Sequence, residues 1–344
     1  MSAVQGSVAP GYEPVRDAFT QFADEESQLA VVVGGERVVD LRKGGDGDAL
    51  TGVYSVTKGA AVIAVAALVQ AGKLDLDAAA RSTPFPLTVR ELLGHRSGLI
   101  GVEGGLTIEE AADDQIIARR LATQKPFWTP GTAYGYHALV MGALLDAELR
   151  AVTGRSVQQW YTELLRDPFE LDLWMGLPES LEPRFRPLLP TLGPAYAPEP
   201  GSLRAIAFNT TFDLLDFGNT RLVRALGPAS AGGVGNARGV AGLYSAALTV
   251  LDPATITEFS RPYSLGVDRV TEQADHFALG FEHLRADYPY LGPRAIGHSG
   301  ATGSLGWADA DAGVAYGYVR RRFGYPGPEN VPLGAAVMAA AAAA

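Results

Sequence analysis

The stretch Ser55-Val-Thr-Lys-Gly-Ala-Ala-Val-Ile-Ala-Val-Ala-Ala-Leu-Val69 places a serine and a lysine at the start of a long apolar run. Residues three apart on a helix share one face, so a helix that begins here sets Lys58 one turn above Ser55. At a helix N-terminus the backbone N–H groups are free and the helix dipole is positive, which suits a developing oxyanion. The run is shorter than the roughly 20 apolar residues that span a bilayer. We therefore predict a buried core helix with Ser55 at its start.

Lys58 interrupts this apolar run, and two interpretations of the Ser-x-x-Lys pair are open. In one, Ser55 only caps the helix and Lys58 extends its charged end to the surface. In the other, the helix buries Lys58, and a buried ammonium is costly unless it is paired or loses its proton. A lysine with a lowered pKa is a suitable base for a serine nucleophile. The apolar surroundings favour the second interpretation.

Composition excludes several classes of function. The chain has 344 residues, a formal net charge of −10 and no Lys/Arg-rich tract, which argues against a nucleic-acid partner. It contains no cysteine, which excludes disulfides, thiolate metal sites and a cysteine nucleophile. No histidine and carboxylate spacing indicates a metal site, so we expect neither metal nor cofactor. Without a membrane-length apolar run or a signal-peptide pattern, we expect a cytoplasmic protein with no membrane partner.

Strand patterns lie near both ends of the chain. Residues 29–33 and 37–41 flank Gly34-Gly35 and predict one β-hairpin. Residues 304–308 and 314–319 flank a turn and predict a second. Strands near both ends with helices between them indicate one sheet made from the two ends, and no repeat or clean linker divides the chain.

The chain between the hairpins is mainly helical. The clearest helical stretches are 88–93, 108–122, 138–151 and 237–251, and a further helix follows Pro328. We predict an α/β (α+β) fold, with an antiparallel sheet built from both chain ends and flanked by helices. The sheet region comprises residues 1–50 plus 285–344, and the inserted, mainly helical region comprises residues 51–284. Together they are expected to form one catalytic domain.

Trp128-Thr-Pro-Gly-Thr-Ala-Tyr-Gly-Tyr-His137 carries two tyrosines on a loop. Tyrosines near a turn more often serve packing than catalysis. A tyrosinate beside a lysine ammonium could nevertheless relay the serine proton, because each charge favours the ionised form of the other. The residues alone leave both roles open for Tyr136.

Gly297-His-Ser-Gly-Ala301 imitates the nucleophile elbow of α/β-hydrolases, whose serine is followed in the chain by an acid and then a histidine. The 45 residues after Ser299 contain no histidine, so that order is impossible. The segment is better interpreted as an edge strand whose backbone and side chains line a cleft.

Three other patterns favour structural roles. Gly232-Gly-Val-Gly-Asn-Ala-Arg-Gly239 has the wrong spacing for a dinucleotide fingerprint and predicts a turn into a helix at Ala237. Asp309 and Asp311 lie in a hairpin turn without a third acidic partner, which argues against calcium. His95 follows a helix and is expected to brace a turn.

Five segments occur in a fixed order along the chain. They are Ser-x-x-Lys58, Thr88-Val-Arg-Glu-Leu-Leu-Gly-His-Arg-Ser-Gly-Leu99, Trp-x-Pro-Gly-Thr-x-x-x-Tyr136, Gly-Gly-Val-Gly-Asn-Ala-Arg238 and Gly-His-Ser-Gly300. In this order they resemble the serine β-lactamase-like family. Within it the chain is most similar to the family VIII carboxylesterases, relatives of class C β-lactamases and DD-peptidases.

The resemblance implies a β-lactamase/transpeptidase-like fold and a role for each matching residue. It casts Ser55 as the acylated nucleophile, Lys58 as its activating partner and Tyr136 as the catalytic tyrosine. It casts His298, Ser299 and Gly300 as the substrate-binding strand that matches Lys-Thr-Gly. The backbone N–H groups of Ser55 and Ala301 would form the oxyanion hole that acyl transfer requires.

Two departures bear on the substrate. The lactamase pattern Tyr-x-Asn is here Tyr136-His137-Ala138, which lacks the amide that contacts a β-lactam side chain. Lys-Thr-Gly is here His298-Ser299-Gly300, which exchanges a permanent cation for a group mostly neutral at pH 7. Both changes weaken the case for an anionic β-lactam or a peptide carboxylate.

We therefore predict a serine carboxylesterase (EC 3.1.1 type) that hydrolyses small-molecule carboxylic esters through an acyl-enzyme on Ser55. Within the same fold the alternatives are a weak β-lactamase, an amidase or an acyltransferase. From another class, the alternative is a non-catalytic binding protein on this fold. The physiological ester and the oligomeric state stay open.

Overall fold

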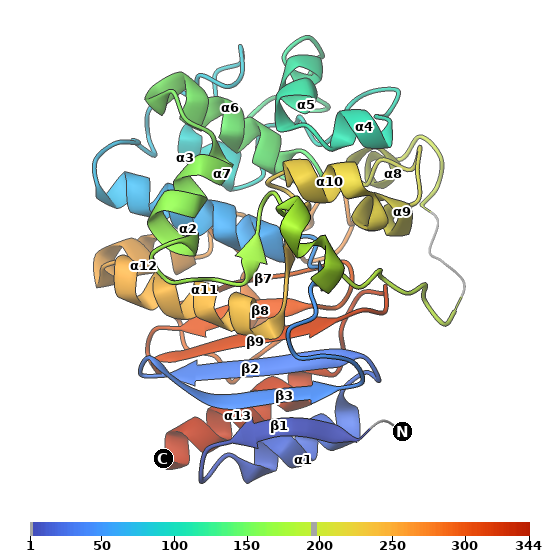
Figure 1. The fold of residues 1–344 in the computed structure, drawn as a ribbon. Coiled ribbons are helices and arrows are strands. Elements are labelled where there is room, and N and C mark those ends of the chain that lie inside the picture. The colour runs from blue at the N-terminus through green and yellow to red at the C-terminus, as the bar shows by residue number, and fades with distance from the viewer. Residues whose placement is uncertain (1–2, 194–197) are drawn as a thin grey trace.

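A six-stranded antiparallel sheet forms the base of the molecule, and its strands come from both ends of the chain (Figure 1). The computed structural model describes residues 3–193 and 198–344. The strand order is β1-β3-β2-β9-β8-β7. The bounds are β1 Val4–Val8, β2 Ser27–Val33, β3 Glu36–Lys43, β7 Ala295–Ser299, β8 Leu305–Asp309 and β9 Val314–Arg320. The pairing of β2 with β9 joins the two chain ends, which confirms the predicted fold class.

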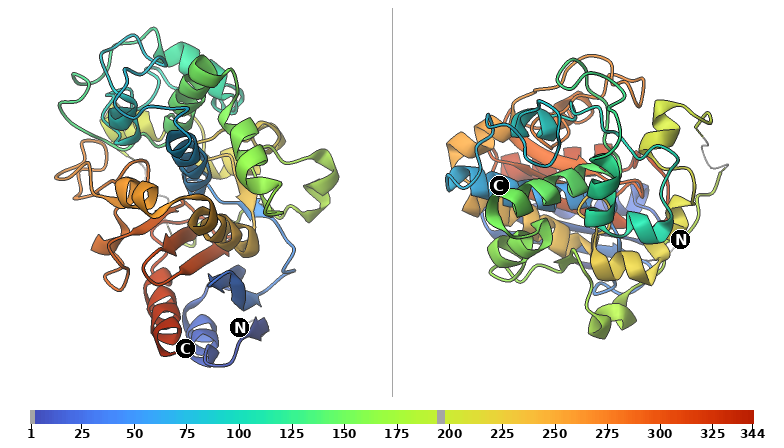
Figure 2. Two further views of the ribbon diagram at one scale, coloured as in Figure 1. Left: turned by 90° about the vertical axis from the view of Figure 1, so that its left-hand side faces the viewer. Right: turned by 90° about the horizontal axis from the view of Figure 1, so that it is seen from above.

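Helices cover both faces of this sheet. On one face pack α1 (Glu13–Phe22) and α13 (Asn330–Ala343), which lie side by side (Figure 2), and on the other packs α11 (Ala237–Val250). Alternate strand residues serve the two sides, since Tyr316 joins the core beneath α1 and α13 while Ala315 joins the core beneath α11. The backbone of α11 comes so close to the sheet that a Cβ on Gly317 would lie 2.5 Å from the carbonyl oxygen of Ala237.

The helical region lies against the β7 edge of the sheet (Figure 1). Its helices are α2 Val56–Gln70, α3 Val89–Leu93, α4 Ile108–Ala111, α5 Asp114–Leu121, α6 Met141–Thr153, α7 Val157–Tyr161, α8 Leu203–Ala207, α9 Leu214–Asn219, α10 Arg221–Leu226 and α12 Pro253–Ser260, with a π-helical turn at Thr162–Arg166 and 3-10 turns at Glu179–Arg184 and Leu284–Ala286. A small sheet of order β4-β6-β5 combines β4 Thr51–Gly52, β6 Val234–Gly235 and β5 Leu173–Trp174. Helix α2 is buried on all sides because it is apolar on all sides.

Two predicted helices differ from those observed. The single helix expected at 108–122 is broken into α4 and α5, because the Asp113 side chain caps the start of α5 by accepting N–H bonds from Gln115 and Ile116. The helix expected from Ala138 begins at Met141, which leaves the carbonyl of Ala138 outside the helix. The hairpins, the helix from Ala237 and the C-terminal helix are confirmed, whereas α1 and β1 were not predicted.

The division into residues 1–50 plus 285–344 and residues 51–284 stays a prediction, and α11 shows how closely the two parts are joined, because it belongs to the second part and packs on the sheet. Among the described residues, no helix is both long and apolar enough to cross a membrane. Met1 and Ser2, with which the signal-peptide prediction begins, lie outside the described residues.

Candidate active site

Ser55 lies at the turn between β4 and α2, as the N-cap residue of that helix. The residue before it, Tyr54, has a φ of 48°, in the left-handed region that a bulky side chain rarely adopts. The fold holds Tyr54 in place, because its side chain is buried and its hydroxyl donates to the carbonyl of Leu214. A strained turn held by its surroundings is typical of a functional position, and here it presents the Ser55 hydroxyl.

Lys58 is buried beside Ser55, with 1% of its surface exposed. Its Nζ lies 3.2 Å from Ser55 Oγ and donates to the carbonyls of Ala138 at 2.6 Å and Ser230 at 2.9 Å. Burial lowers the pKa of Lys58 to about 7, against which the nearby Glu282 raises it. In the neutral amine both N–H bonds are taken by the two carbonyls, so the lone pair is free to accept the Ser55 proton. The surface-cation interpretation of Lys58 is therefore wrong.

Tyr136 also contacts Ser55: its hydroxyl donates to Ser55 Oγ at 2.8 Å, and Lys58 Nζ lies over its ring, 5.0 Å from the centroid. Its ring stacks on Phe277, with centroids 5.6 Å apart and planes inclined by 2°. Tyr134, by contrast, directs its hydroxyl to the carbonyl of Gly266 at 2.7 Å. Burial raises the pKa of Tyr136 well above its ordinary value, so the phenol keeps its proton rather than forming the tyrosinate considered above.

The end of β7 lies against the Ser55 turn. A Cβ on Gly300 would lie 2.3 Å from the carbonyl oxygen of Val53, so only glycine permits this approach. As predicted, β7 is an edge strand of the sheet. Within the described part of the chain, neither the Ser55 N–H nor the Ala301 N–H donates to another protein group. Both therefore stay available to a ligand oxygen.

His298 is fully buried at this edge. Its Nδ1 lies 2.7 Å from the carbonyl oxygen of Ser299, and because a carbonyl can only accept, Nδ1 carries the proton. Burial lowers the pKa of His298 to about 3, so the ring is neutral. Its Nε2 is buried without a hydrogen-bond partner among the described residues. The N–H of the ring therefore already has an acceptor in Ser299, and the substrate-binding role that the resemblance implies for His298 stays a prediction.

Comparison with known proteins shows the family of this chain. The Beta-lactamase family model matches residues 15–340. The chain belongs to the beta-lactamase family. The esterase/beta-lactamase LipL of Mycobacterium tuberculosis is 30% identical over 333 residues, which span 86% of this chain and 76% of LipL. Among solved structures, EstA from Arthrobacter nitroguajacolicus Rue61a matches with a TM-score of 0.92 at 36% identity and 99% coverage of both chains. A family VIII carboxylesterase matches with a TM-score of 0.85 at 29% identity and 99% coverage of both. The family resemblance seen in the sequence is confirmed.

This beta-lactamase family member has a half-buried acid at the site that the sequence did not reveal. Glu282 accepts a hydrogen bond from the Ser299 hydroxyl at 2.7 Å and another from the Ser299 N–H at 2.9 Å. His298 Nδ1 lies 3.2 Å from the same carboxylate. Burial raises the pKa of Glu282 to about 7. No motif marks Glu282, since it lies in a loop whose approach to β7 follows only from the tertiary fold.

His95 positions Tyr136 through the backbone on either side of it. His95 has a φ of 59°; its carbonyl accepts the Gly135 N–H at 3.1 Å and its Nδ1 accepts the His137 N–H at 3.2 Å. The Thr88–Leu99 motif therefore does more than brace a turn, because it fixes the segment that carries Tyr136. His137 in turn contacts the buried Ser97 hydroxyl at 2.5 Å through Nε2.

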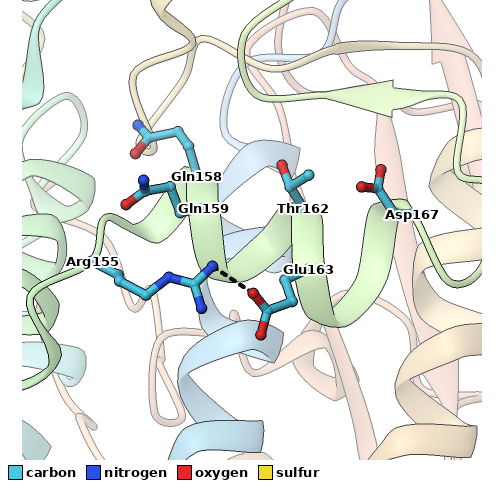
Figure 3. Close-up of a pocket in the computed structure, with 6 residues that line it drawn as sticks. All are labelled: Arg155, Gln158, Gln159, Thr162, Glu163 and Asp167. Carbon is cyan, nitrogen blue, oxygen red and sulfur yellow. Dashed lines mark ion pairs between the residues drawn. The ribbon is translucent and has the colours of Figure 1, made fainter.

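A surface depression away from Ser55 lies on the helical region. It is lined by Arg155, Gln158, Gln159, Thr162, Glu163 and Asp167 (Figure 3). An ion pair of 2.6 Å between Arg155 and Glu163 crosses it. None of the predicted site residues lines it.

Proposed function

We propose that this protein is a serine carboxylesterase that hydrolyses carboxylic esters through an acyl-enzyme on Ser55. One observation carries the proposal: Ser55 Oγ, at the N-terminus of a buried helix, lies within hydrogen-bond distance of both Lys58 Nζ and Tyr136 Oη. A nucleophile needs a base within about 3 Å that can accept its proton. The structural match to a family VIII carboxylesterase, at 29% identity, supports ester chemistry.

The arrangement supplies each proton transfer of acyl transfer. Neutral Lys58 takes the proton of Ser55 Oγ as that oxygen attacks the ester carbonyl, and the oxyanion accepts the N–H groups of Ser55 and Ala301. Tyr136 donates its proton to the departing alkoxide and regains one from Lys58. Water then attacks the acyl-enzyme, with the same groups acting in reverse order. The proposal needs no metal or cofactor.

The alternatives on this fold are a weak β-lactamase, an amidase, an acyltransferase and a catalytically silent binding protein. The first two are disfavoured because His298 is buried and neutral, and because Ala138 replaces the amide of the lactamase pattern. A catalytically silent binding protein would need neither the unbonded Ser55 N–H nor a lysine whose pKa is lowered to about 7. An acyltransferase would differ only in passing the acyl group to an alcohol instead of to water. Adding alcohols to the assay and measuring the new ester distinguishes the two.

The test is a rapid-mixing assay with p-nitrophenyl butyrate and, in parallel, nitrocefin. We expect a burst of p-nitrophenol stoichiometric with enzyme, because an acyl-enzyme accumulates when deacylation is slower. We expect kcat/KM for the ester to exceed that for cephalosporins by at least ~10², about 2.7 kcal/mol of differential transition-state binding. Equal kcat/KM for a cephalosporin and the ester would overturn the esterase assignment in favour of a β-lactamase. Absence of turnover of both substrates would favour the non-catalytic binding protein.

Ester hydrolysis should depend on pH through Lys58. Burial lowers its pKa to about 7, so the amine is a free base above that pH and a cation below it. We expect kcat/KM to fall as the pH drops through this value, measured from mildly acidic to mildly alkaline buffers.

A variant identifies which group is titrating, because Lys58 and Glu282 are coupled. The Glu282 carboxylate raises the pKa of Lys58, so Glu282→Gln should move the acidic limb to lower pH. If protonation of Glu282 itself limits activity, the limb disappears in this variant. A profile that is flat across neutral pH in the unaltered enzyme would remove Lys58 as the base.

A further inference from the structure

Among the described residues, the hydrogen-bond donors that the Ser299 and His298 side chains and the Ser299 N–H supply at the end of β7 are directed at groups of the protein itself. The Ser299 hydroxyl and the Ser299 N–H each bind one oxygen of the Glu282 carboxylate, at 2.7 and 2.9 Å. The Nδ1 proton of His298 points to the Ser299 carbonyl and to Glu282. A carboxylate bound by adjacent donors in this way has the geometry of a bound anion. Here that anion belongs to the chain.

The protonation states of the side chains around Ser55 leave Glu282 as the charged group among them. Burial lowers the pKa of Lys58 to about 7 and that of His298 to about 3, and it raises the pKa of Tyr136 well above its ordinary value. All three groups are therefore uncharged in mildly alkaline buffer. Burial raises the pKa of Glu282 only to about 7, so Glu282 is ionised under the same conditions. Among Lys58, His298, Tyr136 and Glu282, the charged group is then Glu282.

Glu282 lies where a substrate would sense it. The Glu282 side chain is 24% exposed, so it is not sealed from the solvent. Besides burial, its charge raises the pKa of Tyr136, which is half-buried, and of Tyr325, which is 65% exposed. The carboxylate is thus within electrostatic reach of both the reacting hydroxyls and the solvent-exposed surface.

We propose that Glu282 occupies, from within the protein, the place on β7 that a substrate carboxylate would take, so that the site selects esters with uncharged or cationic acyl chains and discriminates against anionic ones. The proposal rests on the proposed function, since it concerns esters that acylate Ser55. An anionic acyl chain would find the strand's donors already bound and would face a like charge, whereas an ammonium would gain a partner.

Three esters of one length test the proposal: p-nitrophenyl hexanoate, the p-nitrophenyl monoester of adipic acid and p-nitrophenyl 6-aminohexanoate. They share the leaving group and a six-carbon acyl chain, and they differ in the group at its far end, which is a methyl, a carboxylate or an ammonium. In mildly alkaline buffer, with non-enzymatic hydrolysis subtracted, we expect kcat/KM for the hexanoate to exceed that for the adipate by at least about 10²-fold. We expect the aminohexanoate to be at least as good a substrate as the hexanoate.

The variant Glu282→Gln keeps the size and an acceptor oxygen for Ser299 while it removes the charge. It should narrow the hexanoate-to-adipate ratio by at least about tenfold. Asp287→Asn is the matched control, since Asp287 is exposed in the same segment and its loss changes the net charge equally. A ratio within about twofold of the original in Glu282→Gln, or an equal narrowing in Asp287→Asn, overturns the proposal.

A measurement on the unaltered enzyme stands if Glu282→Gln fails to fold. Arylboronic acids form a reversible tetrahedral adduct with a nucleophilic serine. The 3-carboxyphenyl and 3-carbamoylphenyl compounds have nearly the same size and shape, but the first carries a carboxylate and the second an uncharged amide. We expect the carbamoyl compound to inhibit hexanoate hydrolysis at least about tenfold more strongly. Equal inhibition contradicts the role of Glu282. Absence of ester turnover and of boronate inhibition contradicts the proposed function instead, so the two failures are distinguishable.

Discussion

Replacement of Ser55 by alanine should abolish ester hydrolysis while the fold persists. The alanine variant loses the attacking oxygen, so kcat should fall by several orders of magnitude, to the residual level given by binding and the oxyanion hole. The structural cost is small, because Ser55 makes no capping hydrogen bond with its side chain although it occupies the N-cap position. Even a lost capping bond would cost only about 1 kcal/mol. Thermal unfolding of both proteins, measured beside p-nitrophenyl butyrate turnover, separates the two effects.

Covalent labelling identifies the nucleophile directly. A fluorophosphonate should attach to Ser55, as shown by mass spectrometry of peptides, and the label should be absent from Ser55→Ala. Ser97 is an internal comparison, because it also contacts a histidine, His137, yet it is 1% exposed and should stay unlabelled. An adduct on Ser299 would contradict the assignment of Ser55 as the nucleophile and would favour the nucleophile-elbow interpretation. The structure argues against that outcome, since the Ser299 hydroxyl already donates to Glu282.

The local part of the site could be predicted because it depends on helix periodicity. The spacing of Ser55 and Lys58 fixes them on one face of any helix that contains both, and an apolar helix implies that Lys58 is buried. The structure shows both features. In the same way, two hairpins near the chain ends imply that the sheet joins those ends, as the pairing of β2 with β9 shows.

What the sequence did not reveal depends on contacts between distant segments. The carbonyls that hold Lys58 belong to Ala138 and Ser230, and any residue could supply them, so no side-chain pattern marks them. Glu282 lies in an irregular loop, and only its approach to β7 gives it a role. Strand β1 was missed because Val4-Gln-Gly-Ser-Val8 lacks a clear alternation, and its place in the sheet comes from pairing with β3.

Tyr136→Phe and Lys58→Ala should each lower kcat/KM by about 10²–10⁴-fold, the range expected for loss of a general acid or base. Both side chains contact the same atom, Ser55 Oγ, and each proton transfer involves both. Groups that act as one unit give strongly non-additive effects. The double variant should therefore be nearly as active as the less active of the two single variants. Multiplicative losses would mean that the two residues act in separate steps.

Tyr134→Phe is the matched control for Tyr136→Phe, since it removes the same atom two residues away. The Tyr134 hydroxyl binds the carbonyls of Gly266 and Asp275, away from Ser55, so the variant should lose about 1 kcal/mol of stability and keep most of its activity. Tyr136→Phe retains its ring against Phe277, so its loss of activity should come without unfolding. Lys58→Ala leaves two buried carbonyls without a donor, so its melting temperature must be measured before its kinetics are interpreted. Comparable losses in Tyr134→Phe and Tyr136→Phe would show that the hydroxyl at 2.8 Å from Ser55 Oγ is not the proton donor.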